Sequence, residues 1–267
     1  MLLLSSGVLN HKIKKNIKEG YLTFSLNLAH SNLSGYNVCP KAQKLQRSND
    51  HSTTLNQERD PALAGCSFSC VGGGGLAGVY TAVLESRIKK TISFFKDRDY
   101  FLQALAYEIE KAIKQAKNKG LKPAFRLNAY SDILWERFKV KDNKNIFELF
   151  PGVEFYDYTK ILNRKTPPNY TLTYSHFGNW KETAAALNQG LNVAVVFQEL
   201  PPYVNINKKL IPVIDGDVTD LRINESVNGS NCIVGLKFKG SKKELNQAIN
   251  ERFTIPAAHN LRAYICN

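Results

Sequence analysis

Five cysteines are distributed unevenly along this chain of 267 residues. Cys39, Cys66 and Cys70 fall within a stretch of 32 residues, whereas Cys232 and Cys266 lie far away in the sequence. An odd and low number of cysteines in a chain of this length is not typical of a disulfide framework. The clustering of the first three suggests a ligand, because thiolates are soft donors that suit zinc or iron–sulfur clusters.

Three interpretations of this cysteine triplet remain open. A [4Fe–4S] cluster with three cysteine ligands and one open iron fits the number of thiols, although such clusters normally have four ligands. A structural zinc ion prefers four ligands, and the fourth would come from His30 or from one of the two distant cysteines. Buried thiols that bind nothing are the third interpretation, because cysteine is among the residue types most often buried.

A run of four glycines follows the triplet and is a second candidate for contact with a ligand. Gly72, Gly73 and Gly74 begin this run, and Gly75 ends it. Glycine lets the backbone approach a ligand closely, so we expect the first three to lie near a cofactor. The run has neither the lysine of a Walker loop nor the spacing of a dinucleotide fingerprint. A flexible turn explains it equally well.

The elements that must position these residues alternate between strands and helices. Strand-like runs occupy residues 21–29, 124–130, 153–158, 171–175, 193–197, 212–214 and 233–238. Apolar spacing and capping residues predict helices at 84–95, 102–113, 145–150, 180–188 and 242–252. This alternation favours a parallel sheet with helical crossovers, either an open α/β sheet or a partly closed barrel. We expect a single domain over residues 1–267 with a polar insertion at about 41–61.

Polar residues follow several of the predicted strands, at the ends where ligands bind in parallel α/β folds. Asn128, Ser131 and Asp132 follow one strand, Lys160 follows the next, and His176 follows the third. We expect Asp132, Lys160 and His176 to line the substrate side as catalytic residues, and Asn128 and Ser131 to contact a cofactor. Two other interpretations remain: polar residues are common where loops begin, and Asp132 and Lys160 could form a salt bridge between neighbouring strands.

Composition excludes several classes of protein. Hydrophobic residues make up 43% of the chain, which is too many for a disordered protein. No apolar run reaches the ~20 residues that a membrane helix needs. The first lysine, Lys12, comes after the apolar N-terminus, which is the reverse of a secretory signal. We therefore expect a soluble, intracellular protein that does not act with a membrane.

The chain is strongly basic, since 36 Lys and Arg residues face 23 Asp and Glu residues and give a formal charge of +13. This excess is dispersed, as on solvated helix faces, but it also permits attraction to a polyanion such as nucleic acid. The sequence has no helix-turn-helix spacing, no zinc-finger pattern and no evident basic stripe interleaved with aromatic residues. Charge alone therefore allows a nucleic-acid partner without identifying one.

Three segments between residues 125 and 175 carry a recognisable pattern. They read FRLNAYSD at 125–132, PGVEFYDYTK at 151–160 and PNYTLTYS at 168–175. Together with the first strand and the cysteine triplet, they resemble the uncharacterised phage proteins of the gene-product-88-like group, over roughly residues 21–197. Their layout is in turn similar to that of radical SAM enzymes, in which the cluster loop follows the first strand.

The resemblance implies a radical-SAM-like fold, a partial (βα)6-type parallel barrel, in a phage-encoded protein of the host cytoplasm. It implies a [4Fe–4S] cluster held by Cys39, Cys66 and Cys70, with S-adenosylmethionine (SAM) at the open iron. The basic charge then favours a nucleotide or nucleic acid as the substrate. The alternative hypothesis is a non-enzymatic phage protein on the same barrel that binds nucleic acid or a host protein.

Overall fold

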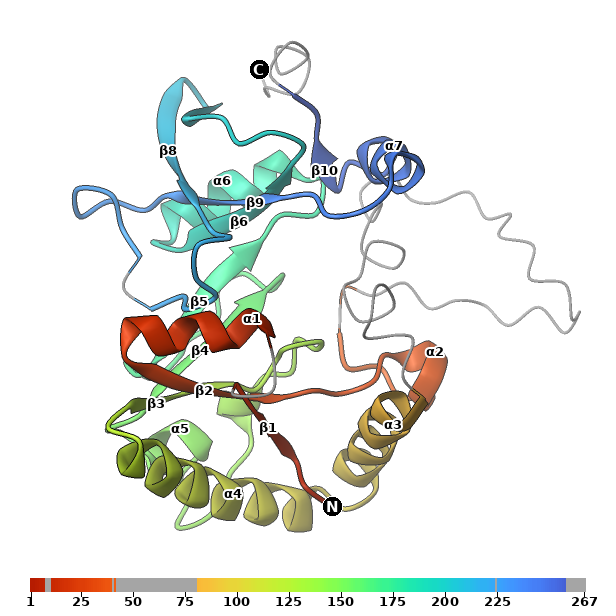
Figure 1. Ribbon diagram of the computed structural model, residues 1–267, viewed down its shortest axis with the longest axis vertical. Coiled ribbons are helices and arrows are strands. Elements are labelled where there is room, and N and C mark those ends of the chain that lie inside the picture. Colours follow the sequence, from red (N-terminus) through yellow and green to blue (C-terminus); the bar gives the residue numbers. More distant parts are fainter. Residues whose placement is uncertain (8–10, 40, 42–80, 224, 258–267) are drawn as a thin grey trace, which may run out of the picture.

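The computed structural model describes residues 1–7, 11–39, 41, 81–223 and 225–257, which form a mixed α/β structure around one sheet (Figure 1). The strands are β1 (Leu4–Ser6), β2 (Tyr21–Leu26), β3 (Lys122–Arg126), β4 (Glu154–Thr159), β5 (Tyr170–Ser175), β6 (Asn192–Phe197), β7 (Tyr203–Ile206), β8 (Lys209–Asp215), β9 (Ile233–Lys237) and β10 (Thr254–Ile255). The helices are α1 (His11–Lys14), η1 (Lys15–Glu19), α2 (Ser31–Ser34), α3 (Thr81–Lys96), α4 (Arg98–Asn118), η4 (Trp135–Arg137), α5 (Ile146–Leu149), α6 (Trp180–Asn188) and α7 (Lys242–Asn250).

The centre of the sheet is parallel and its strands follow the order of the chain. Strands β2 to β6 are neighbours in sequence order, and β9 and β8 continue the parallel arrangement. Both ends depart from it, because β1 is antiparallel to β2 and β7 is antiparallel to β8. The prediction of an α/β fold with a parallel sheet is confirmed. The prediction was a partial (βα)6-type parallel barrel, and the structure has a mixed sheet of ten strands. Over the described residues the sheet is open, since β1 and β7 do not pair.

The seven predicted strands all occur, with shifted boundaries, as β2 to β6, β8 and β9. The predicted helices occur as α3 to α7, and α6 covers residues 180–188 as expected. Asp97 caps α4, since its side chain accepts a hydrogen bond from the backbone N–H of Tyr100. Strands β1, β7 and β10 were not predicted, and each has four residues or fewer.

The outer face of the sheet is apolar because side chains alternate along each strand. Phe24, Phe125 and Phe155 lie on neighbouring strands and stack in succession, with ring centroids 5.4 Å apart in both pairs. They belong to one buried cluster with Leu105 and Ile109 of α4. This packing fixes α4 and its neighbours against the outer face, as Figure 1 shows.

The opposite face of the sheet is polar and is covered by η1 and by the segment after β8. Asn16 of η1 donates to Thr23 Oγ1 (2.9 Å) and to Tyr156 Oη (3.0 Å). Arg126 of β3 forms an ion pair with Asp220 (2.6 Å). These contacts hold β2, β3 and β4 in place beneath the ends where the candidate site lies.

Several predictions concern residues outside the described ranges. These are the polar insertion at about 41–61 beyond Lys41, the cysteines Cys66 and Cys70, and the glycines Gly72, Gly73 and Gly74. Among the helices that the structure describes, none has both the length and the apolar content that crossing a bilayer requires.

Candidate functional site at the carboxyl edge

The carboxyl edge of the sheet, where β2 to β6 end, brings together segments that are far apart in sequence. Val38 lies after β2, and its carbonyl accepts a hydrogen bond from the backbone N–H of Asp132, which lies after β3 (2.8 Å). Cys39 therefore lies beside the end of β3, half-buried. It is the one member of the predicted triplet within the described ranges. Those ranges contain no group of three or more His, Cys, Asp and Glu side chains arranged to hold a metal ion.

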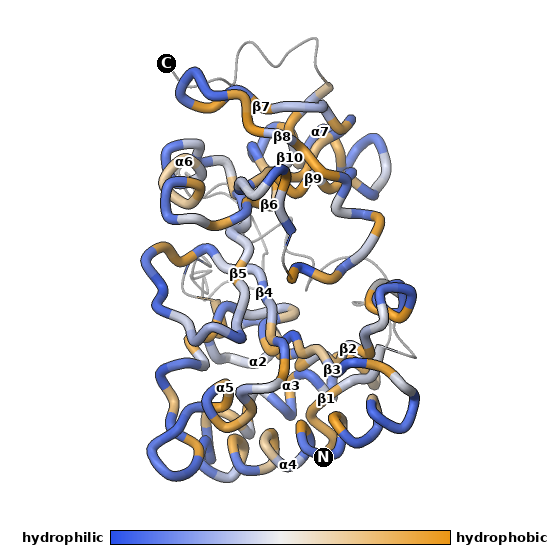
Figure 2. The backbone as a smooth tube through the Cα atoms, turned by 90° about the vertical axis from the view of Figure 1, so that its left-hand side faces the viewer, coloured by the Kyte–Doolittle hydropathy of each residue, from blue (hydrophilic) through white to orange (hydrophobic). Residues whose placement is uncertain are grey.

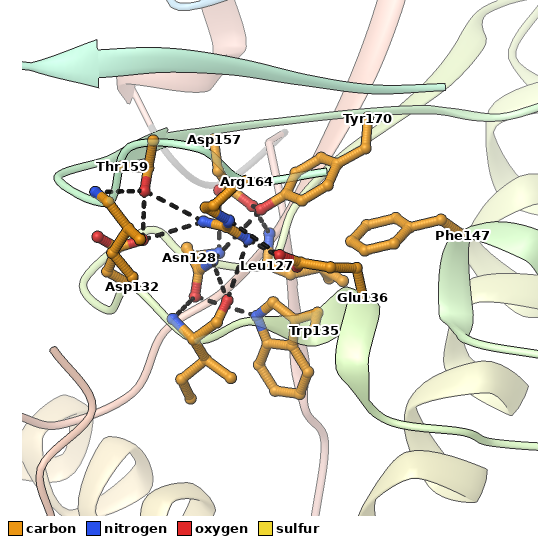
Figure 3. A network of polar contacts seen from close by, with 12 residues as sticks. Leu127, Asn128, Asp132, Trp135, Glu136, Phe147, Asp157, Thr159, Arg164 and Tyr170 are labelled. Carbon is orange, nitrogen blue, oxygen red and sulfur yellow. Dashed lines mark hydrogen bonds and ion pairs between the residues drawn. The ribbon is translucent and has the colours of Figure 1, made fainter. Parts of the chain in front are cut away.

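Asp132 lies in a buried network at this edge (Figure 3). Its carboxylate accepts hydrogen bonds from the Thr159 hydroxyl (2.9 Å) and from the backbone N–H of Lys160 (2.8 Å). It also forms an ion pair with Arg164 (3.1 Å). Burial raises the pKa of Asp132, while the Lys160 N–H and the Arg164 charge oppose that shift. The alternative of a salt bridge between Asp132 and Lys160 is therefore wrong: Asp132 pairs with Arg164 and accepts a hydrogen bond from the backbone of Lys160.

Arg164 is the centre of this network. Its Nε and Nη2 atoms donate to the two carboxylate oxygens of Glu136, at 3.0 and 2.7 Å. This bidentate geometry is the strong form of an arginine–carboxylate contact. The guanidinium also lies 5.6 Å from the ring centroid of Tyr170. Since the Arg164 side chain is 3% exposed, one buried cation serves both Asp132 and Glu136.

The two residues predicted to contact a cofactor contact each other. Asn128 Oδ1 accepts hydrogen bonds from Ser131 Oγ (2.8 Å), the backbone N–H of Ile133 (2.9 Å) and Trp135 Nε1 (3.0 Å). Its Nδ2 atom donates to the carbonyl of Ile133 (2.9 Å). These contacts fold the segment after β3 back on itself. A cofactor contact by Asn128 or Ser131 stays a prediction, and their contacts support a positioning role.

Asp157 of β4 ties this segment to its neighbours. It accepts hydrogen bonds from the backbone N–H groups of Leu127 (3.1 Å) and Asn128 (2.9 Å) and from Tyr170 Oη (3.1 Å). Asp157 is fully buried. Burial raises its pKa to about 7, while the charge of Arg126 acts in the opposite direction. Asp157 therefore ties the segment after β3 to the middle of β4 and to the first residue of β5.

Lys160 points away from this network, toward the end of β5. Its Nζ donates to Ser175 Oγ (3.2 Å) and lies 6.0 Å from the ring centroid of Phe177. The Nζ of Lys41 lies 5.6 Å from the same ring and pairs with Glu182 (3.2 Å). Two ammonium groups thus lie within about 6 Å of one aromatic ring, a cation–π distance, and one of them is paired with a carboxylate.

His176 follows β5 directly and is 3% exposed. Its Nδ1 lies 2.7 Å from Thr183 Oγ1, and its ring centroid lies 4.4 Å from that of Trp180. Its Nε2 is buried and has no hydrogen-bond partner. Burial lowers the pKa of His176 to about 3, and the charge of Lys160 adds to that shift. The imidazole is therefore neutral at physiological pH, and one of its two nitrogens has no partner among the described residues.

The structure thus divides the five predicted residues of the strand ends into two groups. Asn128, Ser131 and Asp132 belong to the buried network, whereas Lys160 and His176 lie at the end of β5. Whether any of them is catalytic or binds a cofactor stays a prediction. The sequence analysis missed Ser175, although it lies directly before His176 in the PNYTLTYS segment.

Comparisons with known proteins place the chain in a family. No curated protein and no solved structure matches it. The family model described as Gene product 88 matches residues 2–256, which is nearly the whole chain. This match confirms the resemblance to the phage proteins of that group and extends it beyond residues 21–197. The chain belongs to the Gene product 88 family.

Proposed function

We propose that this protein is a radical-SAM-like phage protein whose carboxyl edge holds an iron–sulfur cluster and acts on a nucleotide or nucleic acid. One observation carries the proposal: the hydrogen bond between Val38 and Asp132 sets Cys39 beside the ends of β3 and β4. Lys160 and His176 lie at the same edge. The sequential order of β2 to β6 gives further support, since barrels that carry ligands at this edge are wound in that order.

The donor set suits a cluster better than it suits zinc. Cys39, Cys66 and Cys70 supply three thiols, and thiolates are the usual ligands of iron–sulfur clusters. Cys232 is fully buried just before β9, which counts against it as a fourth zinc ligand. When bound, a [4Fe–4S] cluster supplies an electron and an open iron at which SAM binds.

The residues at the end of β5 would bind and orient the substrate. Lys160 and Lys41 supply positive charge for a phosphate or another anionic group. His176 is neutral, so its Nε2 can exchange a hydrogen bond with a ligand without adding charge. Asp132 and Asn128 act as positioning residues, because they hold the segments that carry Lys160 and Cys39.

Anaerobic reconstitution with iron and sulfide tests this proposal. The purified chain should turn brown, with charge-transfer absorbance in the visible range and about four irons per chain. Replacing Cys39, Cys66 or Cys70 with alanine should lower the bound iron and bleach the absorbance. Cys232→Ala is the matched control, since it removes a thiol far from the triplet in sequence, and it should bind as much iron as the wild type.

The basic charge of the chain favours a second candidate, a nucleic-acid-binding protein without catalysis. A colourless, iron-free protein after reconstitution would reject the cluster and leave this candidate. Equal loss of iron in Cys232→Ala and Cys39→Ala would also count against the triplet, because it would mean that iron binds to thiols without selection.

A further inference from the structure

The outer face of α4 carries two tyrosines that are unusually exposed. The side chains of Tyr100 and Tyr107 are 66% and 58% exposed, although large aromatic rings normally lose most of their surface on folding. At about 100° per residue, positions seven apart lie within about 20° of each other around a helix axis. The two rings therefore share one side of the helix, two turns apart.

Two lysines lie on the same side of α4 as these rings, closer to its C-terminal end. Lys111 and Lys114 lie within about 40° of Tyr100 around the helix axis. The Nζ of Lys111 lies 4.4 Å from the ring centroid of Tyr107, which is a cation–π distance. Two exposed aromatic rings followed by two lysines thus share one face of α4, and we call these four residues the stripe.

Further lysines follow the stripe beyond the C-terminal end of α4. Residues 111–122 contain five lysines and no acidic residue. The last of them, Lys122, lies at the start of β3, with its Nζ 5.8 Å from the ring centroid of Tyr21. The pairing of a cation with an aromatic ring therefore recurs past the turn that follows α4.

The stripe is held rigidly and spans the height of the sheet. Leu102, Leu105 and Ile109 anchor the opposite face of α4 in the core. Figure 2 shows α4 at the rim of the molecule, with hydrophobic and hydrophilic residues alternating along it. The helix has 21 residues, about 32 Å, and its C-terminal end leads into the start of β3. Its N-terminal end, with Tyr100, therefore points toward the carboxyl edge.

We infer that the outer face of α4 binds single-stranded nucleic acid, with bases stacked on Tyr100 and Tyr107 and phosphates beside Lys111 and Lys114. Exposed rings stack on unpaired bases without regard to sequence, and lysines follow the backbone. A duplex hides the faces of its bases, so the tyrosines favour a single strand. This surface lies outside the carboxyl-edge site, and binding to it requires no cluster.

Tyrosine variants test the stacking. A fluorescent deoxythymidine oligonucleotide of about 20 nucleotides is titrated with the protein as purified, and anisotropy gives the Kd. Tyr107→Ala should weaken binding about tenfold, the typical effect of losing one stacked base. Tyr107→Phe should bind as the wild type does, because the ring remains. Tyr203→Ala on β7 is the matched control, since Tyr203 is 55% exposed and lies on another element.

Lysine variants test the electrostatic part. The double variant Lys111→Gln and Lys114→Gln should reduce the slope of log K against log salt by about 1.4, since each phosphate contact with a single strand contributes about 0.7. Lys208→Gln with Lys209→Gln removes the same charge from the exposed end of the β7–β8 hairpin, where Lys208 lies in the turn and Lys209 begins β8. This control should leave the slope near that of the wild type.

Three results would overturn the inference. They are tighter binding of a duplex than of a single strand of equal length, equal losses in Tyr107→Ala and Tyr203→Ala, and equal changes of salt slope in the two lysine pairs. Circular dichroism of each variant establishes that the fold is retained. Because the assay needs no iron, a colourless protein that passes it rejects the cluster alone, and a brown protein that fails it rejects the α4 surface alone.

Discussion

Two polar clusters lie at the carboxyl edge of the same sheet, and they differ in how completely their atoms are paired. The buried network around Arg164 connects Asp132, Glu136 and Thr159 through hydrogen bonds and two ion pairs. At the end of β5, Nε2 of His176 is buried without a partner.

This difference separates two roles that look alike in sequence. A buried charge is tolerated when its partners are supplied by the protein, and the result is a rigid support. A buried polar atom without a protein partner costs stability, so the end of β5 is the less completely paired of the two clusters. We call the network around Arg164 the support and, following the proposed function, the residues at the end of β5 the binding part of the edge.

Replacing Arg164, the cation at the centre of the support, should have the largest effect and tests whether the two clusters differ. Arg164→Met leaves the carboxylates of Asp132 and Glu136 buried without their cation, and we expect a loss of about 3–5 kcal/mol in the free energy of unfolding. Chemical denaturation measures it. Lys160→Met is the matched control and should cost less than about 1 kcal/mol, since the Lys160 side chain is partly exposed. Similar losses in the two variants would erase the distinction between support and binding part.

Asn128 provides a second, smaller test of the support. Asn128→Ala leaves the indole N–H of Trp135 and the backbone N–H of Ile133 without their acceptor in a buried site. We expect a loss of about 2–3 kcal/mol, the cost of stranding buried donors. The fluorescence of Trp135 should change in the folded variant, because its hydrogen bond is gone. An unchanged stability and spectrum would show that the segment after β3 is not held by Asn128.

The sequence revealed the central strands because their pattern is local. In the segment that forms β2, Leu22, Phe24 and Leu26 alternate with smaller or polar residues, and these three side chains are buried on the outer face. Strand β1 has three residues and exists through its pairing with β2, a contact between distant parts of the chain that no local pattern reports. The mixed character of the sheet was therefore not predictable from periodicity.

The sequence also predicted that polar residues gather at the carboxyl edge of the sheet, but not which of them contact each other. A salt bridge between Asp132 and Lys160 was one interpretation of the sequence, but Asp132 pairs with Arg164 and accepts a hydrogen bond from the backbone N–H of Lys160, which has no signature in sequence. Arg164 lies in a basic stretch that was interpreted as solvated charge. Its bidentate partner Glu136 lies 28 residues away on η4, so only the fold brings them together.

The pH dependence of stability tests whether His176, in the binding part, is held neutral. The pKa of His176 is lowered to about 3 in the folded chain, against about 6.5 when unfolded. Between these values the unfolded state binds a proton that the folded state does not, so stability falls as pH falls, by up to about 1.4 kcal/mol per pH unit. Denaturation of wild type and His176→Gln between about pH 4 and 7 measures this contribution.

The comparison with the variant is needed because Asp157 acts in the opposite direction. Its pKa is raised to about 7, so its contribution to stability falls as pH rises from its unfolded value toward 7. Asp157 is present in both proteins, and the difference between them isolates His176. Parallel pH profiles of the two proteins would mean that His176 is not held neutral.

The smallest expected effect concerns Ser175, the partner of Lys160 at the end of β5. Ser175→Ala removes the acceptor of the Lys160 ammonium, but this group is partly exposed and water can replace the hydroxyl. We expect the free energy of unfolding to change by less than about 1 kcal/mol. Because the ammonium then keeps its charge without its protein partner, the affinity for an anion should not fall, and inorganic phosphate measured by calorimetry is a simple probe. A loss of several kcal/mol would instead assign Ser175 and Lys160 to the support, because it would mean that their contact holds the end of β5 in place.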